Sequence, residues 1–130
     1  MNAATTPLRT AAVLALWTAG CTFIARGPDQ YRDDTRALLE TRTGSIKACY
    51  DKALEKDPAA SGTVTVHFKV EKKTGTISEV EVDEEATTAP SSLASCVAQA
   101  IDGLQLTPED RRDGIATFSW QFRPGAPAAG

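Results

Sequence analysis

The chain has 130 residues, 42% of them hydrophobic and 24% charged, a length and composition that suit one small folded domain. Its 14 basic and 17 acidic residues give a net charge of −3, and no basic patch is visible. This balance excludes the usual kind of nucleic-acid-binding protein, which needs clustered positive charge to neutralise phosphates.

The first segment has the character of a bacterial lipoprotein signal. Arg9 precedes an apolar run from Ala11 to Gly20, and this run is too short to span a bilayer, which needs about 20 apolar residues. Thr18-Ala19-Gly20-Cys21 resembles a lipobox, with Thr18 where leucine is usual. We therefore expect residues 1–20 to be removed and Cys21 to carry lipid. An uncleaved anchor, or plain secretion with a later cut, are the alternatives.

Residues 21–30 are expected to form a short tether, because the Gly27-Pro28 pair argues against regular structure. A helix is predicted to follow and to end at Asp57-Pro58, because the residue before proline disfavours the helical region. Gly44-Ser45 predicts a kink or a restart within it. Its apolar stripe has helical spacing and consists of Leu39, Ile46, Cys49, Tyr50, Ala53 and Leu54.

Two strands joined by a turn are predicted next. Residues 63–70 alternate strictly, with Val64, Val66, Phe68 and Val70 on one face. Lys73-Thr74-Gly75 predicts a hairpin turn in which the glycine takes a positive φ. A second strand should run over 76–83, with a bulge near Ser78, because Ile77 is out of phase with the two valines that follow.

A second helix and a third strand complete the predicted domain. Ser91 or Ser92 suits the start of the helix, and its apolar stripe runs from Leu93 through Cys96 to Leu104. The strand covers 115–122, and we expect its Trp120 to belong to the core, as we do for Tyr50. Residues 124–130 should form a disordered tail, so the folded domain is expected to cover 31–123.

These elements predict an α+β fold. Two amphipathic helices should cover one face of a three-stranded antiparallel sheet in a two-layer sandwich, with the order helix–strand–strand–helix–strand. Cys49 and Cys96 lie one on each buried helical stripe, and in an exported chain such a pair favours a disulfide over two free thiols. A metal site is less favoured, since two cysteines and His67 fall short of four ligands.

At this point the residues resemble a family of bacterial envelope domains. Ile-x-x-Cys-Tyr from Ile46, the strand from Gly62 to Phe68, Gly75 with Ile77, Ser95-Cys96-Val97 and the closing aromatic strand together resemble the C-terminal domain of AgmX/PglI gliding-motility proteins. That domain is similar to the C-terminal domain of TonB. The resemblance covers about residues 44–123. It implies the same fold, paired Cys49 and Cys96, and a link to an envelope-spanning motility or transport complex. The chain lacks the long periplasmic linker of a TonB-like transducer.

The predicted function is non-enzymatic. His67 is best explained as a cross-strand or solvated side chain, and Glu79, Glu81 and Asp83 as a solvated acidic face, so no catalytic residue, metal or cofactor is predicted. If the third strand pairs with the first, it is an edge that an extended segment can join by strand addition, as TonB-like domains do. The candidate binding residues are Ile115, Thr117, Ser119 and Gln121.

We therefore expect a periplasmic, membrane-anchored lipoprotein, in the outer membrane of a Gram-negative bacterium, whose partner is an envelope protein or an extended peptide. Membrane contact should come through the N-terminal lipid, and no nucleic acid is expected. The alternatives are a small secreted enzyme and a protease-inhibitor-like domain, although the cystatin loop motif is absent from the hairpin.

Overall fold

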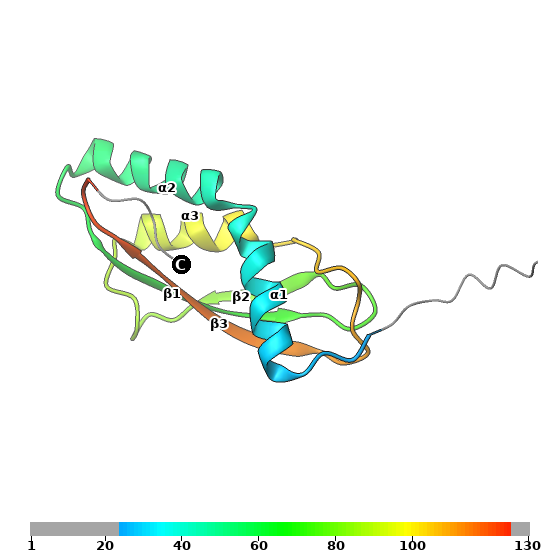
Figure 1. Cartoon of the computed structure of the whole chain (residues 1–130). Coiled ribbons are helices and arrows are strands. Elements are labelled where there is room, and N and C mark those ends of the chain that lie inside the picture. The colour runs from blue at the N-terminus through cyan, green and yellow to red at the C-terminus, as the bar shows by residue number, and fades with distance from the viewer. Residues whose placement is uncertain (1–23, 126–130) are drawn as a thin grey trace, which may run out of the picture.

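Three helices and three strands make up residues 24–125, the part of the chain that the computed structural model describes. In chain order these elements are α1 (Pro28–Glu40), α2 (Thr43–Lys56), β1 (Gly62–Val70), β2 (Ile77–Val82), α3 (Ser91–Ile101) and β3 (Gly114–Phe122). The strands form one antiparallel sheet in the order β2-β1-β3, so β2 and β3 are its edges (Figure 1). The predicted α+β class and strand order are confirmed.

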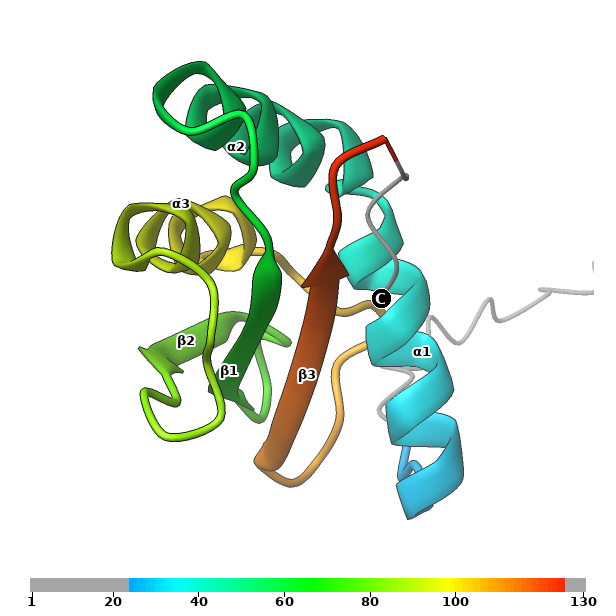
Figure 2. The ribbon, with the colours of Figure 1, turned by 90° about the vertical axis from the view of Figure 1, so that its left-hand side faces the viewer.

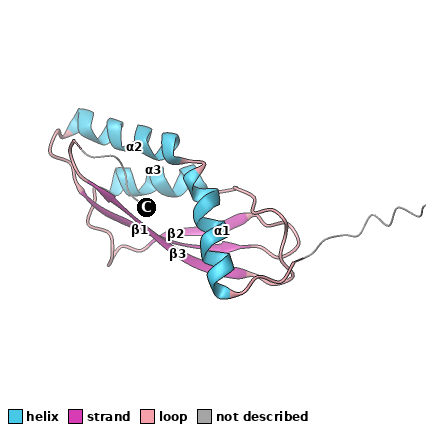
Figure 3. Ribbon diagram, in the orientation of Figure 1, coloured by secondary structure: helices cyan, strands magenta, loops and turns pink. Residues whose placement is uncertain are grey.

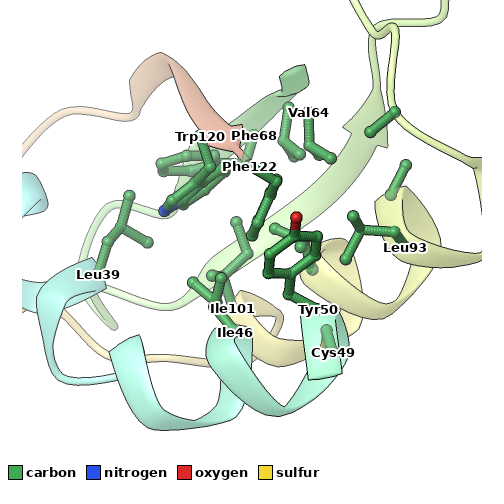
Figure 4. Close-up of a cluster of buried hydrophobic side chains, with 14 of the residues drawn as sticks. Leu39, Ile46, Cys49, Tyr50, Val64, Phe68, Leu93, Ile101, Trp120 and Phe122 are labelled. Atoms are coloured by element: carbon green, nitrogen blue, oxygen red, sulfur yellow. The ribbon is translucent and has the colours of Figure 1, made fainter. Parts of the chain in front are cut away.

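Helices α2 and α3 cover one face of the sheet, as predicted (Figure 2). The alternation along β1 buries its even-numbered side chains beneath these helices, because successive side chains of a strand point to opposite faces. Tyr50 is buried against Phe122, with 5.1 Å between ring centroids, and its hydroxyl donates to the Ala60 carbonyl at 2.7 Å (Figure 4). Burial raises the pKa of the Tyr50 hydroxyl. Tyr50 and Trp120 are therefore core residues, as expected.

The predicted bulge lies in β2. His67 pairs with Glu81 and Lys69 with Ser78, so two residues of β2 lie opposite the single Phe68 of β1. The extra residue, Glu79, has a φ of 50°. The bulge shifts the phase of the strand by one residue, and this returns Ile77 to the buried face.

The start of the first helix differs from the prediction. Helix α1 begins at Pro28, so residues 28–30 are helical where a tether was expected. Proline suits the first helical position because its fixed φ is already helical and its missing N–H has no partner to lose there. The break between α1 and α2 lies at Thr41-Arg42, ahead of the predicted site at Gly44-Ser45.

The segment before α1 packs on the domain and is not a free tether. Arg26 is only 1% exposed. Its backbone N–H donates to Asp110 Oδ2 at 2.7 Å, and its side-chain Nε donates to Asp34 Oδ2 at 2.6 Å. Ile24 forms an isolated parallel bridge with Asp110. Among the described residues, the folded unit therefore includes residues 24–30, ahead of the expected boundary at residue 31.

The expected signal sequence and Cys21 lie outside the described residues, as does the tail from residue 126 on. Within residues 24–125, none of the helices combines the length and the apolar character that crossing a bilayer would require.

Candidate functional site

The two cysteines of the predicted pair are joined. Cys49 of α2 and Cys96 of α3 form a disulfide, with 5.7 Å between their Cα atoms, although the two residues are 47 positions apart in the sequence. Two free thiols, the alternative left open by the sequence, are excluded. The bond joins α2 to α3, the two helices that cover the sheet, so its role is structural.

The outer edge of β3 is the predicted binding surface, and the hydrogen bonds of β1 fix which of its backbone groups are free. The Thr65 carbonyl of β1 accepts from the Asp83 N–H at 2.9 Å, on the β2 side. In an antiparallel strand, the backbone groups of successive residues point to opposite sides. Those of Val64 and Val66 therefore point toward β3.

Val64 pairs with Trp120 of β3, and Val66 with Phe118. The backbone groups of Trp120 and Phe118 consequently point back to β1, and those of Ser119, between them, point away from the sheet. The same alternation directs outward the N–H and C=O groups of all four candidate residues, Ile115, Thr117, Ser119 and Gln121. Within residues 24–125, no hydrogen bond reaches these outward groups.

The side chains of the candidate residues lie on the face of the sheet opposite the helices. Ile115 is 87% exposed, which is unusual for a large apolar side chain. Thr117 and Ser119 are anchored to β1: Ser119 Oγ lies 2.8 Å from Thr65 Oγ1, and Thr117 Oγ1 lies 2.6 Å from His67 Nδ1. These bonds hold the edge strand in register along its exposed length.

A groove runs beside this edge, where the sequence predicted no pocket. Helix α1 crosses next to the first half of β3 (Figures 1 and 3), and between them is a groove of about 490 Å³. Its walls include residues 114–118 of β3 and Tyr31, Arg32 and Thr35 of α1. A second hollow of about 170 Å³ lies near the end of α1, lined by Arg36, Leu39 and Trp120 among others. Part of the edge is therefore flanked by a helix.

Tyr31 lies at the end of the groove where β3 begins. Its ring packs on Gly114, where a Cβ atom would lie 2.5 Å from the ring, so this contact requires glycine. The Tyr31 hydroxyl donates to the Arg112 carbonyl at 3.1 Å, and burial is the main cause that raises the pKa of this hydroxyl. Farther along, the Arg36 guanidinium lies 6.0 Å from the centre of the Phe118 ring.

His67 takes part in a chain of hydrogen bonds on the open face. Its Nε2 lies 2.8 Å from Asp83 Oδ2, and its Nδ1 contacts Thr117. The pKa of Asp83 is lowered, first by the Ala86 backbone N–H and then by His67. The order carboxylate–imidazole–hydroxyl is that of a hydrolase triad.

The surroundings of Thr117 do not suit a nucleophile. Its oxygen lies on an open sheet face, and the backbone N–H groups beside it lie in the plane of the sheet. None points up from the face to where an oxyanion would form, although such donors supply much of the catalysis of acyl transfer. The hydrogen-bond chain is best explained as a link across three strands, the role expected for His67.

Glu79 and Glu81 of β2, and Asp83 just after it, are distributed along the same face. Glu79 Oε1 lies 3.5 Å from Lys69 Nζ, and Asp83 is held by His67. No group of three potential metal ligands occurs among residues 24–125. Glu79 and Glu81 are exposed and Asp83 is half-buried, so these carboxylates lie on the solvent-facing side of the sheet.

Sequence reasoning missed the arginines around the groove, Arg26, Arg32, Arg36 and Arg112. Arg32 and Arg36 are four apart, a spacing that places them on one helical face, but nothing local to the sequence places Arg26 or Arg112 beside them. Comparisons with known proteins add no relative: no family model, no curated protein and no solved structure matches this chain.

Proposed function

We propose that this protein is a non-enzymatic, lipid-anchored module of the cell envelope that binds an extended segment of a partner protein along β3. One observation carries the proposal. Ile115, Thr117, Ser119 and Gln121 direct their backbone donors and acceptors away from the sheet, and no described residue bonds to them. Such an edge is a template for an added strand.

The expected strength of this docking is modest. Each backbone hydrogen bond contributes about 1 kcal/mol net, because the peptide gives up bonds to water when it pairs. The bonds to four residues therefore contribute a few kcal/mol, and side-chain contacts must supply the rest. A transient complex follows from this arithmetic, of the kind that suits a partner that must be released.

The envelope location rests on the N-terminal sequence and on the disulfide. Disulfides persist in exported proteins and are rare in the reducing cytosol, so the Cys49–Cys96 bond favours export. Lipid on Cys21 would hold the domain at the periplasmic side of a membrane. The resemblance to motility and TonB-like domains favours a partner that belongs to an envelope-spanning complex.

Photo-crosslinking identifies the partner first. A photoreactive phenylalanine analogue is placed at Gln121, whose side chain is exposed beside the free edge, and the cross-linked protein is identified by mass spectrometry. The matched control places the same analogue at Lys52, on the exposed surface of α2. We expect one partner to be captured from Gln121 and not from Lys52.

The substitution Ser119→Pro then tests the docking mode. Proline removes the one outward N–H at the centre of the edge, and it is tolerated on an edge strand whose N–H faces solvent. Ser119→Ala is the control, because it also loses the contact with Thr65 but keeps the N–H. We expect Ser119→Pro to weaken partner binding and Ser119→Ala to preserve it. Undiminished affinity in a folded Ser119→Pro variant would mean that the partner docks elsewhere, with the acidic face around Glu81 the next candidate.

A further inference from the structure

We propose that the segment that docks on β3 is acidic, and that its carboxylates lie against arginines of α1 and of the loop before β3. This inference rests on the proposed strand addition and specifies the chemistry of the partner. Three features support it: the charged side chains that line the groove, the unpaired donor atoms of two buried residues, and the direction of α1.

The groove is more basic than the chain that contains it. Arg32, Arg36 and Arg112 are exposed residues that line the groove or the adjoining hollow. The carboxylates that line them are Glu40 and Asp113, and Asp29 lies 3.7 Å from Arg32 Nη1 as an exposed ion pair. Asp113 is already engaged on the other side, where it accepts from the Lys72 N–H at 2.8 Å. Among the side chains that line the groove and the hollow, arginines therefore outnumber carboxylates, on a chain whose net charge is −3.

Two buried residues of the groove carry donor atoms that have no hydrogen-bond partner among the described residues. They are the Nη1 and Nη2 atoms of Arg26 and the hydroxyl of Thr35, and both residues are 1% exposed. Asp34 accepts from the Nε of Arg26, and Asp110 Oδ2 forms an ion pair with Nη1 at 3.9 Å, which is too long for a hydrogen bond. A guanidinium has donors and no acceptor, so the group that completes this site must offer acceptor oxygens.

The direction of α1 adds to the same preference. Pro28, the first residue of this 13-residue helix, lines the groove, and no side chain caps the helix at Gly27. The N-terminal end of a helix carries partial positive charge and favours carboxylates within its first turn. Asp29 of the first turn offsets part of this charge, and the uncapped backbone N–H groups add the rest to the potential that the arginine side chains create.

The geometry of an added strand predicts the spacing of the acidic residues. Successive side chains of an extended segment alternate between the two faces of the sheet. Arg36 lies over Phe118 on the helix-covered face, so the carboxylates that meet the arginines should occur at every second position. The expected ligand is an extended segment with glutamate or aspartate at positions i and i+2.

Three synthetic peptides test this preference on the full chain. A fluorescein-labelled ten-residue peptide alternates glutamate with threonine, and its two counterparts carry glutamine or lysine in place of glutamate. Fluorescence anisotropy measures each dissociation constant at low salt and at 0.5 M salt. We expect the glutamate peptide to bind at least tenfold more tightly than the glutamine peptide at low salt, and the difference to shrink at high salt because ions screen exposed charges.

Charge reversal locates the effect. Arg32→Glu combined with Arg36→Glu should weaken the affinity for the glutamate peptide at least tenfold and leave the affinity for the glutamine peptide unchanged. The control, Lys52→Glu with Lys56→Glu, changes the net charge by the same amount on α2, away from the groove, and should leave both affinities unchanged. Melting temperatures confirm that each variant is folded.

The outcomes separate this inference from the proposed function. Equal affinities for the glutamate and glutamine peptides, with Ser119→Pro weakening both, would overturn the acidic preference and leave strand addition in place. An acidic preference that Ser119→Pro does not alter would place the peptide away from β3 and overturn this inference, while strand addition would still be decided by the effect of Ser119→Pro on the cross-linked partner. If the glutamate peptide does not bind at millimolar concentration, the acidic preference is wrong, and strand addition is then decided by the cross-linked partner.

Discussion

Breaking the bond between Cys49 and Cys96 should cost a large share of the stability of this domain. The two residues are 47 positions apart, and the chain-entropy model then assigns the cross-link about 4 kcal/mol, because the bond restricts the unfolded chain. Small domains have a free energy of unfolding of about 5–15 kcal/mol in total. The reduced protein is therefore expected to be markedly less stable, and only marginally folded if the total lies near the lower end of that range.

Urea unfolding of the chain carrying Cys21→Ser, which removes the third thiol, measures this effect. With an m-value of about 2 kcal/mol/M, the loss of 4 kcal/mol corresponds to a midpoint that is lower by roughly 2 M in the reduced protein. The double variant Cys49→Ala/Cys96→Ala should unfold near the midpoint of the reduced protein. As a control, reductant should not change the midpoint of this double variant.

Two results would refute the reasoning. If the oxidised and reduced proteins unfold at the same urea concentration while thiol titration shows two free thiols after reduction, the cross-link does not limit the unfolded chain. If the double variant responds to reductant as strongly as the parent, the reductant acts at another site.

Three further predictions concern a turn, a carboxylate and the N-terminus. Gly75→Ala should destabilise the domain by more than about 1 kcal/mol, since φ is 69° and a Cβ atom would lie 2.0 Å from the Leu106 carbonyl oxygen. Gly103→Ala is the control, because Gly103 has a similar φ of 78° but open space around it. The difference between the two variants in thermal melts measures the effect of the clash alone. Burial would raise the pKa of Asp110, but backbone N–H donors hold this pKa below its ordinary value of 3.8. The contribution of the ionised Asp110 to stability is therefore present above pH 3.8 and is lost as the pH falls below that value. Melting temperatures from pH 5 to pH 2 should therefore fall less steeply in Asp110→Asn than in the parent, and equal slopes would contradict this assignment. Mass spectrometry of protein from envelope fractions should find Cys21 as a lipid-modified N-terminal residue; an intact Met1 would show that the signal interpretation is wrong.

The sheet and its helical cover follow from the sequence because their signals are local. The period of two along residues 63–70 identifies the buried face of β1, and the out-of-phase Ile77 predicts the bulge that the structure contains. One cysteine on each buried stripe predicts the disulfide. In each case the pattern and the contact it predicts depend on the same few side chains.

The start of the domain could not be predicted in the same way. Arg26 is buried because Asp110, 84 positions away, accepts from its backbone N–H, and no periodicity marks such a pair. A partial signal was present in Gly27-Pro28-Asp29, since proline at the first position and an acidic residue in the first turn are typical of a helix start. The groove depends on where α1 lies against β3, and the sequence gives no rule for that placement.

The contact between Ile24 and Asp110 also has a mechanical consequence. It joins the incoming N-terminal chain to the loop directly before β3. If the chain carries the proposed lipid anchor and binds the proposed partner on β3, a tensile load between the two follows a short path through residues 24–26 and 109–110. Strands β1 and β2 and the cross-linked helices lie outside this path. Under load, the few hydrogen bonds around Arg26 would break first. The N-terminal segment would then lengthen while the sheet and the cross-linked helices are still folded.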